Sequence, residues 1–278
     1  MGSPTTRVVD PARAVSSGPR ARESACYHPG ALNELTDLER HEVSLAEHQL
    51  TDFRAMNLFR MVAARVIPGS VIDVGCGGGG MVAWLLEHGH DARGIDMSAS
   101  TVRAAQGFLE GRGLDPSRIS NVALEELIAD GQHCDNVVSM DVIEHIEDDK
   151  AAFAKLVELT RVGGRLVITV PAMMALWSER DVAMKHYRRY APAELRALAE
   201  RHPLKIEELR YWNMLGAPPT YLKQKLSKKA LDESFRYGKQ SLGARMLRSG
   251  LSTWFRLIEN NIRPPLGLTL IMSATRLS

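Results

Sequence analysis

Five residues between positions 73 and 80 combine a carboxylate with a glycine-rich turn. Asp73 ends an apolar run, and Gly75, Gly77, Gly79 and Gly80 follow within seven residues. Their spacing satisfies both Gly-x-Gly-x-Gly and Gly-x-Gly-x-x-Gly. Such glycines form a tight turn between a strand and a helix N-terminus, where the backbone approaches a ligand closely. The segment therefore predicts a ligand-binding loop with an acid at its entrance.

A second acid, Asp96, follows at the end of the next apolar run, where it would hold the hydroxyl pair of a ribose. Nicotinamide dinucleotides and S-adenosylmethionine both contain ribose, so Asp96 fits either. Asp73 separates them, because a carboxylate beside the loop repels a pyrophosphate and attracts a sulfonium or an ammonium. The spacing Asp-x-Gly-x-Gly therefore favours S-adenosylmethionine, and a dinucleotide oxidoreductase is the rival that it disfavours.

Three motifs resemble class I S-adenosylmethionine-dependent methyltransferases. Residues 72–79, Ile-Asp-Val-Gly-Cys-Gly-Gly-Gly, resemble the cofactor loop, and Gly-Ile-Asp-Met-Ser at 94–98 resembles the ribose-binding acidic motif. Residues 134–145, Cys-Asp-Asn-Val-Val-Ser-Met-Asp-Val-Ile-Glu-His, resemble the fourth-strand motif of ubiquinone-biosynthesis-like small-molecule methyltransferases. The resemblance covers about residues 60–172. It implies an α/β, Rossmann-like methyltransferase fold, with a seven-stranded, mostly parallel sheet flanked by helices and the last strand inserted antiparallel.

The resemblance also implies a set of cofactor contacts. The family has an acid near the adenine amine, but the matching position here is Ala123, so the backbone of Ala123 and Leu124 would line adenine with Glu125 as a replacement acid. Asp141 would border the methionine moiety or the transferring methyl group. The expected contacts to S-adenosylmethionine, with S-adenosylhomocysteine as product, are Asp73, Gly75, Gly77, Gly79, Asp96, Met97, Ala123, Leu124 and Asp141.

Glu144 and His145 follow the expected fourth strand. Methyl transfer from a sulfonium needs alignment of the nucleophile and exclusion of water, and a general base where the acceptor is a hydroxyl or an acidic carbon. His145 is a candidate base, because the ordinary pKa of histidine is near neutrality. Glu144 is a candidate substrate contact. The alternative is that the Glu-His pair organises the loop and the following helix.

Residues 177–190 form a second polar cluster. It resembles the His-x-Arg-Arg-Tyr segment of a bacterial methyltransferase subgroup whose members modify natural products or envelope precursors. We expect a wall over the acceptor, with the arginines holding an anionic group; the alternative is a solvated turn. The expected catalytic residues are His186 and Tyr187, and the expected substrate contacts are Trp177, Arg188, Arg189 and Tyr190.

Short apolar runs alternate with helical segments from residue 70 onwards, which predicts a parallel sheet with helices on both faces. Ligands of such sheets bind at the carboxyl ends of the strands. Residues 1–28 lack a core pattern and predict a mobile tail, and residues 29–278 predict one methyltransferase domain. That domain includes N-terminal helices over 31–66 and a helical insertion over 214–263 before the last strand.

In the predicted insertion over 214–263, basic residues are interleaved with apolar residues. From Tyr221 to Pro265 there are ten Lys or Arg and three acids. We expect it to cover the acceptor pocket; contact with an anionic membrane surface through 221–258, or a homodimer contact, are the alternatives. The net charge of +2 and the helical spacing of the aromatic residues argue against nucleic acid.

The remaining expectations concern metal, location and reaction. His41, Glu42 and His48 lack a second acidic helix, so no metal is expected, and three scattered cysteines are typical of a cytoplasmic protein. The expected function is transfer of a methyl group to a small, apolar or partly anionic acceptor, as an O-methylation in secondary metabolism. The alternatives are a cofactor-assisted cyclisation or rearrangement, a methyltransferase for a lipid-linked or membrane-surface substrate, and a non-enzymatic membrane-binding protein.

Overall fold

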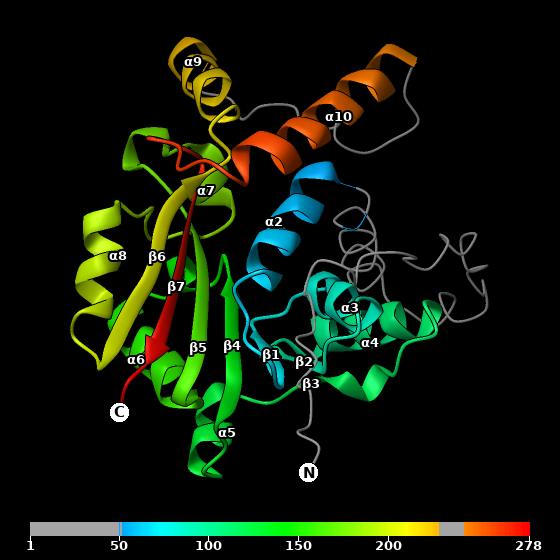
Figure 1. Cartoon of the computed structure of the whole chain (residues 1–278), viewed down its shortest axis with the longest axis vertical. Coiled ribbons are helices and arrows are strands. Elements are labelled where there is room, and N and C mark those ends of the chain that lie inside the picture. Colours follow the sequence, from blue (N-terminus) through cyan, green and yellow to red (C-terminus); the bar gives the residue numbers. More distant parts are fainter. Residues whose placement is uncertain (1–49, 51, 228–241) are drawn as a thin grey trace, which may run out of the picture.

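The computed structural model describes residue 50, residues 52–227 and residues 242–278, which form a seven-stranded sheet (Figure 1). The strand order is β3-β2-β1-β4-β5-β7-β6. β7 pairs antiparallel with β5 and with β6, and the other pairs are parallel. The strands are β1 (Val71–Val74), β2 (Ala92–Ile95), β3 (Ile119–Ser120), β4 (Cys134–Met140), β5 (Thr160–Pro171), β6 (Leu204–Trp212) and β7 (Thr269–Arg276). This arrangement confirms the predicted fold, including the antiparallel last strand.

Two helical layers cover the sheet because successive apolar residues of the central strands point to opposite faces. Val71 and Val138 pack with one layer, whereas their neighbours Ile72 and Val137 pack with the other. The first layer contains α2 (Phe53–Ala63), α3 (Gly80–Glu87) and α4 (Ala99–Gly111). The second contains α5 (Leu124–Ala129), α6 (Asp149–Leu159) and α8 (Pro192–Ala199).

The helix boundaries follow local signals. Ser98 caps α4 by accepting from the backbone amide of Thr101, and Pro192 opens α8, where a missing amide hydrogen costs nothing. Helix α5 was not predicted, since its six residues carry too short a periodic pattern. The segment at 171–190 contains two short helical pieces that the sequence did not predict, the single-turn η5 (Met174–Leu176) and α7 (Glu179–Ala183).

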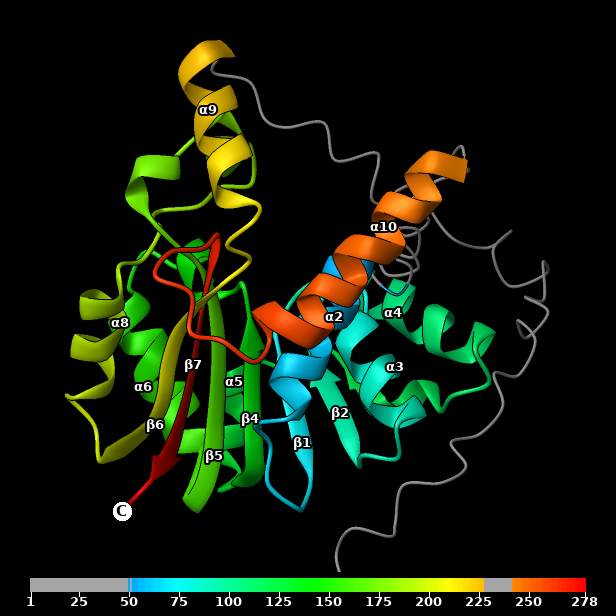
Figure 2. The same ribbon diagram turned by 45° about the horizontal axis from the view of Figure 1, so that its top comes forward.

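The predicted insertion consists, in its described part, of α9 (Ala217–Ser227), α10 (Leu242–Trp254) and the π-helical turn η7 (Phe255–Glu259). Helix α10 lies beside α2 in both ribbon views (Figures 1 and 2). A third apolar cluster joins them to the sheet, with Leu58 and Met61 of α2 against Trp212 and Phe255. Among the described residues, we find no helix with the length and apolarity needed to cross a membrane.

Several predictions fall outside the described residues. These are the mobile tail at 1–28, the helical pattern over residues 31–49, and the part of the insertion from 228 to 241. The described part of the expected N-terminal helical region is α2, which ends at Ala63, shortly before the predicted end at residue 66.

Candidate functional site

The glycine loop joins β1 to α3 at the carboxyl edge of the sheet. Gly75, Gly77 and Gly79 have φ angles of 76°, 52° and 80°, a left-handed conformation that side chains with a Cβ rarely adopt. A Cβ on Gly75 would lie 2.6 Å from a methyl group of Val142, whereas a Cβ on Gly77 would meet nothing within 4 Å. The loop is therefore packed from behind at Gly75 and open in front at Gly77.

Asp96 connects this loop to the end of β2. Its carboxylate accepts hydrogen bonds from the backbone amides of Gly77 at 3.1 Å and Ser98 at 2.9 Å. A carboxylate has about four lone-pair positions, so two acceptor positions remain for a ligand. The structure thus places the acid of the second motif against the glycine loop of the first.

Asp73 lies behind the loop and is 3% exposed. Its Oδ1 atom has no hydrogen-bond partner among the described residues. Burial, assisted by the nearby charge of Asp96, raises the pKa of the Asp73 carboxyl to about 7. A buried acid without a partner is costly, and a cation placed beside it would restore the charged form.

A cavity of 350 Å³ opens beside Asp96 at the ends of β1 and β2. Met97 borders it and is 80% exposed, and Leu124 borders it from the start of α5. Ala123 is the N-cap residue of α5 and precedes this lining. The lining residues are Val74, Gly75, Ile95, Asp96, Met97, Val122, Leu124, Glu125, Val142, Ile146, Asp148, Ala151, Ala152 and Lys155. The cavity matches the place expected for adenosine, although it was not possible to predict its α6 wall from the motifs.

Asp141 follows β4 on the same edge of the sheet, because β4 is the parallel neighbour of β1. It has a φ of 53°, which is uncommon for a residue with a side chain. Thr169 of β5 holds it on both sides: the Thr169 carbonyl accepts from the Asp141 amide at 2.9 Å, and the Thr169 hydroxyl donates to Asp141 Oδ1 at 3.2 Å. Asp141 is thereby fixed in an exposed, strained position at the strand end.

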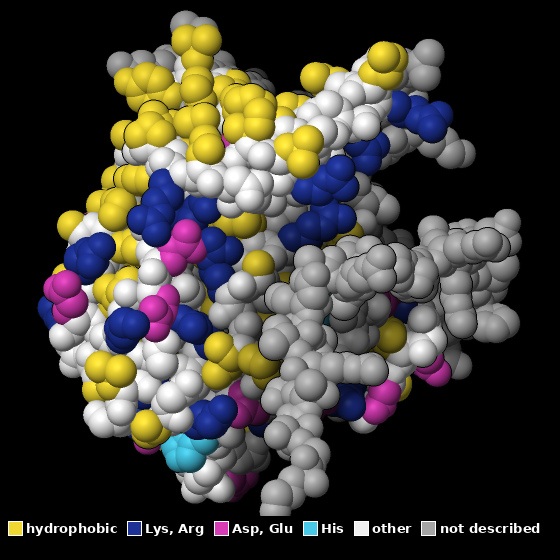
Figure 3. All heavy atoms as spheres, viewed as in Figure 1, with side chains coloured by type: hydrophobic (Ala, Val, Ile, Leu, Met, Phe, Trp, Pro, Cys, Tyr) yellow, Lys and Arg dark blue, Asp and Glu magenta, His cyan; other side chains and the backbone are white. Residues whose placement is uncertain are grey.

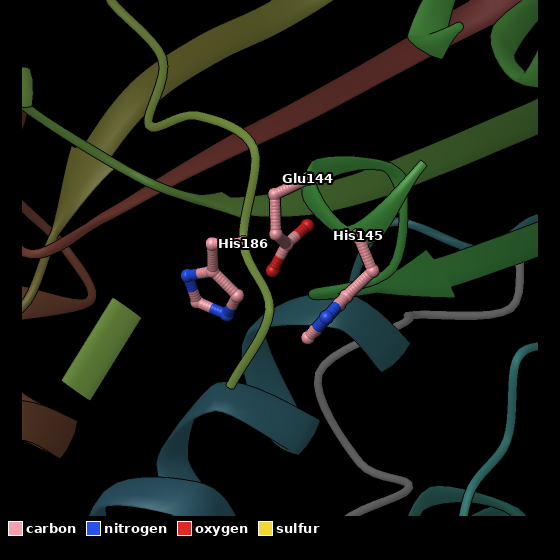
Figure 4. Close-up of side chains that lie close together, drawn as sticks. All are labelled: Glu144, His145 and His186. Carbon is pink, nitrogen blue, oxygen red and sulfur yellow. The ribbon is translucent and has the colours of Figure 1, made fainter. Parts of the chain in front are cut away.

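Glu144, His145 and His186 converge beyond Asp141 (Figure 4). Glu144 and His145 belong to the short turn η4 (Ile143–His145), and His186 comes from the segment after α7. One donor atom from each residue lies within 4.8 Å of the other two, and the histidine rings meet edge to face with centroids 4.6 Å apart. All three residues are candidates from the sequence, but the sequence did not predict that the chain would return His186 to Glu144 and His145.

The environment of the cluster sets its charge. Glu144 is fully buried, and burial, followed by the charge of Asp141, raises its pKa well above the ordinary value. Partial burial and the neighbouring His186 lower the pKa of His145, so this imidazole is neutral near pH 7. A neutral imidazole can accept a proton or bind a cation.

His186 is held by a buried carboxylate. Its Nδ1 lies 3.0 Å from Asp181 Oδ1, and Arg189 grips the same carboxylate with contacts of 2.8 and 3.0 Å. Ser178 adds bonds to Asp181 from its amide and its hydroxyl. Arg189 is thus paired with an internal carboxylate, and its expected role as an anion-holding substrate contact stays a prediction.

The other predicted residues of 177–190 are distributed around this core. Tyr190 is buried and its hydroxyl donates to Asp149 at 2.9 Å, which ties it to the start of α6. Arg188 pairs with the same Asp149 at 2.7 Å, and its anion-holding role stays a prediction. Tyr187 is 53% exposed and its amide donates to the Glu144 carbonyl. Trp177 is half-buried between η5 and α7.

The residues present fit S-adenosylmethionine. Asp73 offers an unpartnered buried carboxylate oxygen to a cation, Asp96 keeps acceptor positions for ribose hydroxyls, and the space before Gly77 is free. A dinucleotide would have to place its pyrophosphate beside the Asp73 carboxylate. The electrostatics of the loop therefore favour the cationic nucleoside.

Comparison with known proteins agrees with this geometry. A methyltransferase domain family model matches residues 72–168. A ubiquinone biosynthesis O-methyltransferase of Coxiella burnetii (strain Dugway 5J108-111) is 33% identical over 96 residues, which are 34% of this chain and 41% of the relative. The chain thus spans about two fifths of that curated relative.

Solved structures share the fold across a larger part of the chain. The Haloferax volcanii complex of the Trm112 methyltransferase activator with a putative methyltransferase has a chain that matches with a TM-score of 0.56 at 15% identity, covering 87% of this chain and 95% of the other. The [4+2]-cyclase SpnF matches with a TM-score of 0.52 at 18% identity, covering 80% and 81%. At these identities the likeness concerns the fold.

The fold, the glycine loop and its two acids define a Rossmann-like domain for a cationic nucleoside cofactor. Residues 72–168 match a methyltransferase domain family, and the glycine loop with its two acids fits S-adenosylmethionine as the cofactor of that domain.

Proposed function

We propose that this protein transfers the methyl group of S-adenosylmethionine to a hydroxyl oxygen of a small organic acceptor. The acceptor oxygen loses its proton and attacks the methyl carbon, while the carbon–sulfur bond breaks and leaves its electron pair on sulfur. The sulfonium is already an activated leaving group, so the protein aligns the two partners and excludes water. The products are the methyl ether, S-adenosylhomocysteine and a proton that is released to solvent.

The observation that carries this proposal is the order of groups along one edge of the sheet. Asp73 and Asp96 stand at the cofactor end, and Asp141 stands at the adjacent end of β4. His145 and His186 follow directly beyond Asp141. In this order the methyl group would lie near Asp141, and the acceptor would approach from the histidine side.

Calorimetric titration of the full chain with S-adenosylhomocysteine and with NAD tests the cofactor part. We expect S-adenosylhomocysteine to bind and NAD to show no measurable heat under the same conditions. Tighter binding of NAD would contradict the proposal. The reaction part is tested by product mass with hydroxylated acceptors: each methyl transfer adds one CH₂ unit.

A cofactor-assisted cyclisation is a second candidate, favoured by one observation. The [4+2]-cyclase SpnF shares the fold over 80% of this chain. A cyclisation or rearrangement would leave the mass of the substrate unchanged and would not consume S-adenosylmethionine. The same mass measurement therefore separates the two reactions.

An acceptor at a membrane surface is a third candidate. A groove of 580 Å³ between α2 and α10 is lined by four arginines, Arg60, Arg245, Arg248 and Arg256. Apolar side chains are exposed on α10 and on α9, among them Leu222, Met246 and Leu247. Figure 3 shows Lys and Arg side chains gathered along α10, with hydrophobic side chains over α9. We propose that this surface contacts an anionic bilayer.

The homodimer, the cytoplasmic location and the setting in secondary metabolism stay predictions from the sequence.

A further inference from the structure

Glu144 is a buried carboxylate that the methyl-transfer scheme does not use. It is fully buried, and neither Oε1 nor Oε2 has a hydrogen-bond partner among the described residues. A carboxylate normally pairs with donors or with a cation when it leaves water. Figure 4 shows its oxygens on the side where the two histidines lie. The unsatisfied oxygens therefore mark a place for a positively charged group.

His186 supplies a nitrogen lone pair that is oriented to bind a cation. Its Nδ1 faces Asp181 Oδ1 at 3.0 Å, so the Nδ1–H donates to that carboxylate and the Nε2 lone pair stays free. Nε2 is buried and has no partner among the described residues. Histidines that bind metals have this arrangement, with a carboxylate on one nitrogen and the ion on the other. Arg189 and Ser178 hold Asp181 in place, so the ring orientation is fixed.

His145 completes the set. One donor atom each from Glu144, His145 and His186 lies within 4.8 Å of the others. Ligands of one ion with bonds of about 2.1 Å lie about 3–4 Å apart, so small side-chain rotations close the set around a cation. His145 is exposed, which leaves the outer side of the cluster open to solvent or to a substrate.

We propose that Glu144, His145 and His186 bind a divalent transition-metal cation with at least one coordination position open to the acceptor. Two imidazoles and one carboxylate suit Zn²⁺, Mn²⁺, Fe²⁺ or Co²⁺ better than Mg²⁺ or Ca²⁺, which favour oxygen ligands. The expectation of no metal considered only the histidines at 41 and 48. The new site depends instead on a loop that returns His186 to the end of β4.

This inference rests on the proposed function for its role in catalysis. A cation lowers the pKa of a hydroxyl placed beside it, because it stabilises the oxyanion. The hydroxyl proton would leave to solvent, and the oxygen would keep the electron pair with which it attacks the methyl carbon. The ion would also orient the acceptor towards Asp141, where the methyl group is expected. The acceptor class that follows is a molecule with a hydroxyl able to bind a metal.

Titration of the metal-free full chain with Co²⁺, in the absence of S-adenosylmethionine, tests the site. We expect one equivalent to bind with a visible absorption band. Glu144→Gln and His186→Ala should each weaken binding at least tenfold, while His133→Ala, an exposed histidine before β4, serves as the matched control. Equal Co²⁺ affinity in wild type and both variants, or no Co²⁺ binding in wild type, would overturn the proposal.

Asp181→Asn tests the positioning of His186. We expect a ten- to hundredfold loss of Co²⁺ affinity with unchanged affinity for S-adenosylhomocysteine, since the amide no longer favours the Nδ1–H tautomer. An unchanged Co²⁺ affinity would remove Asp181 from the site. The open position is tested with azide, which should shift the absorption band of the bound Co²⁺. An unshifted band would mean a closed, structural site and would overturn the catalytic part.

If the variants do not fold, the site can still be tested in the wild-type protein by NMR of the histidine ring protons. Mn²⁺ should broaden the signals of His145 and His186 and leave that of His133 sharp. Broadening of His133 alone would contradict the site. Failure of the metal site and failure of the proposed function are separable: Co²⁺ binding is measured without the cofactor, and S-adenosylhomocysteine binding is measured without metal.

Discussion

The carboxyl group of Asp73 couples cofactor binding to pH. Its pKa is raised from the ordinary 3.8 to about 7 by burial and by Asp96, so the free protein carries a proton there below neutrality. A cationic cofactor favours the ionised form. We expect the affinity for S-adenosylmethionine to fall about tenfold for each pH unit below 7 and to level off above it. Calorimetry at pH values from about 5.5 to 8.5 measures this.

Asp73→Asn is the control for that pH dependence. It should remove the slope and weaken the affinity above pH 7, because the charge is lost. The folded state of the wild type holds a proton that the unfolded chain releases, so the free energy of unfolding falls as the pH rises from 3.8 to about 7. The substitution Asp73→Asn should therefore increase the stability of the free protein above pH 7. A flat affinity profile in wild type would refute the role of Asp73.

Asp96 contributes through direct hydrogen bonds. Asp96→Ala should weaken S-adenosylhomocysteine binding by about 1–3 kcal/mol, since charge-assisted bonds to ribose are lost. The variant also loses the bonds from the Gly77 and Ser98 amides, so Asp96→Asn is the matched comparison for charge alone. If calorimetry shows that Asp96→Ala binds S-adenosylhomocysteine with unchanged affinity, Asp96 does not bind the ribose.

At the scale of elements, the β1–α3 loop depends on close packing against the segment after β4. Gly75→Ala combines a left-handed φ with a Cβ only 2.6 Å from Val142. Gly113→Ala is the matched control, because its φ of 70° is similar and nothing lies within 4 Å of the added Cβ. Both lose about 1–2 kcal/mol from the strained φ. We expect thermal unfolding to show a further loss for Gly75→Ala, with weaker cofactor binding in that variant alone.

Equal stability of the two variants would show that Val142 moves aside freely. A weakened cofactor affinity in Gly113→Ala would show instead that the effect is not local to the loop. Comparing the two variants therefore distinguishes the effect of the Val142 contact on stability from its effect on cofactor affinity.

The strands and the cofactor loop were predictable because they depend on local patterns. The alternation of apolar residues fixes Val71 and Ile72 on opposite faces of β1, and the glycine spacing sets the turn that follows. Parallel pairing of β1, β2 and β4 then brings Asp73, Asp96 and Asp141 to one edge. These contacts follow from the order of the elements.

The histidine cluster was predictable only as a set of residue types. Whether His186 meets Glu144 depends on the path of the segment after β5, which contains the single helical turn of η5 and the five-residue α7. No periodic pattern specifies such a path. Likewise, the residue types of Arg189 and Tyr190 suggested a substrate wall. The partner of Arg189 is Asp181 in α7, and the partner of Tyr190 is Asp149 in α6. Long-range pairing of charged groups cannot be deduced from spacing.

At the scale of the whole molecule, the arginine-lined groove and the apolar tips of α9 and α10 lie on one side (Figure 3). We predict that the full chain sediments with vesicles that contain anionic lipid and much less with neutral vesicles. Each basic residue near such a surface contributes about 1 kcal/mol. The double variant Arg245→Gln and Arg256→Gln should therefore lose about 2 kcal/mol, or about thirtyfold in affinity.

Lys150→Gln is a control for the loss of a basic charge away from the groove. Lys150 is exposed on α6, which covers the opposite face of the sheet, so its loss should leave vesicle binding unchanged. Raising the ionic strength should weaken the binding of wild type, because screening shortens the reach of the arginine charges. Binding that is equal on neutral and anionic vesicles, or equal in the double variant and wild type, would assign the groove to the acceptor or to another protein instead of a bilayer.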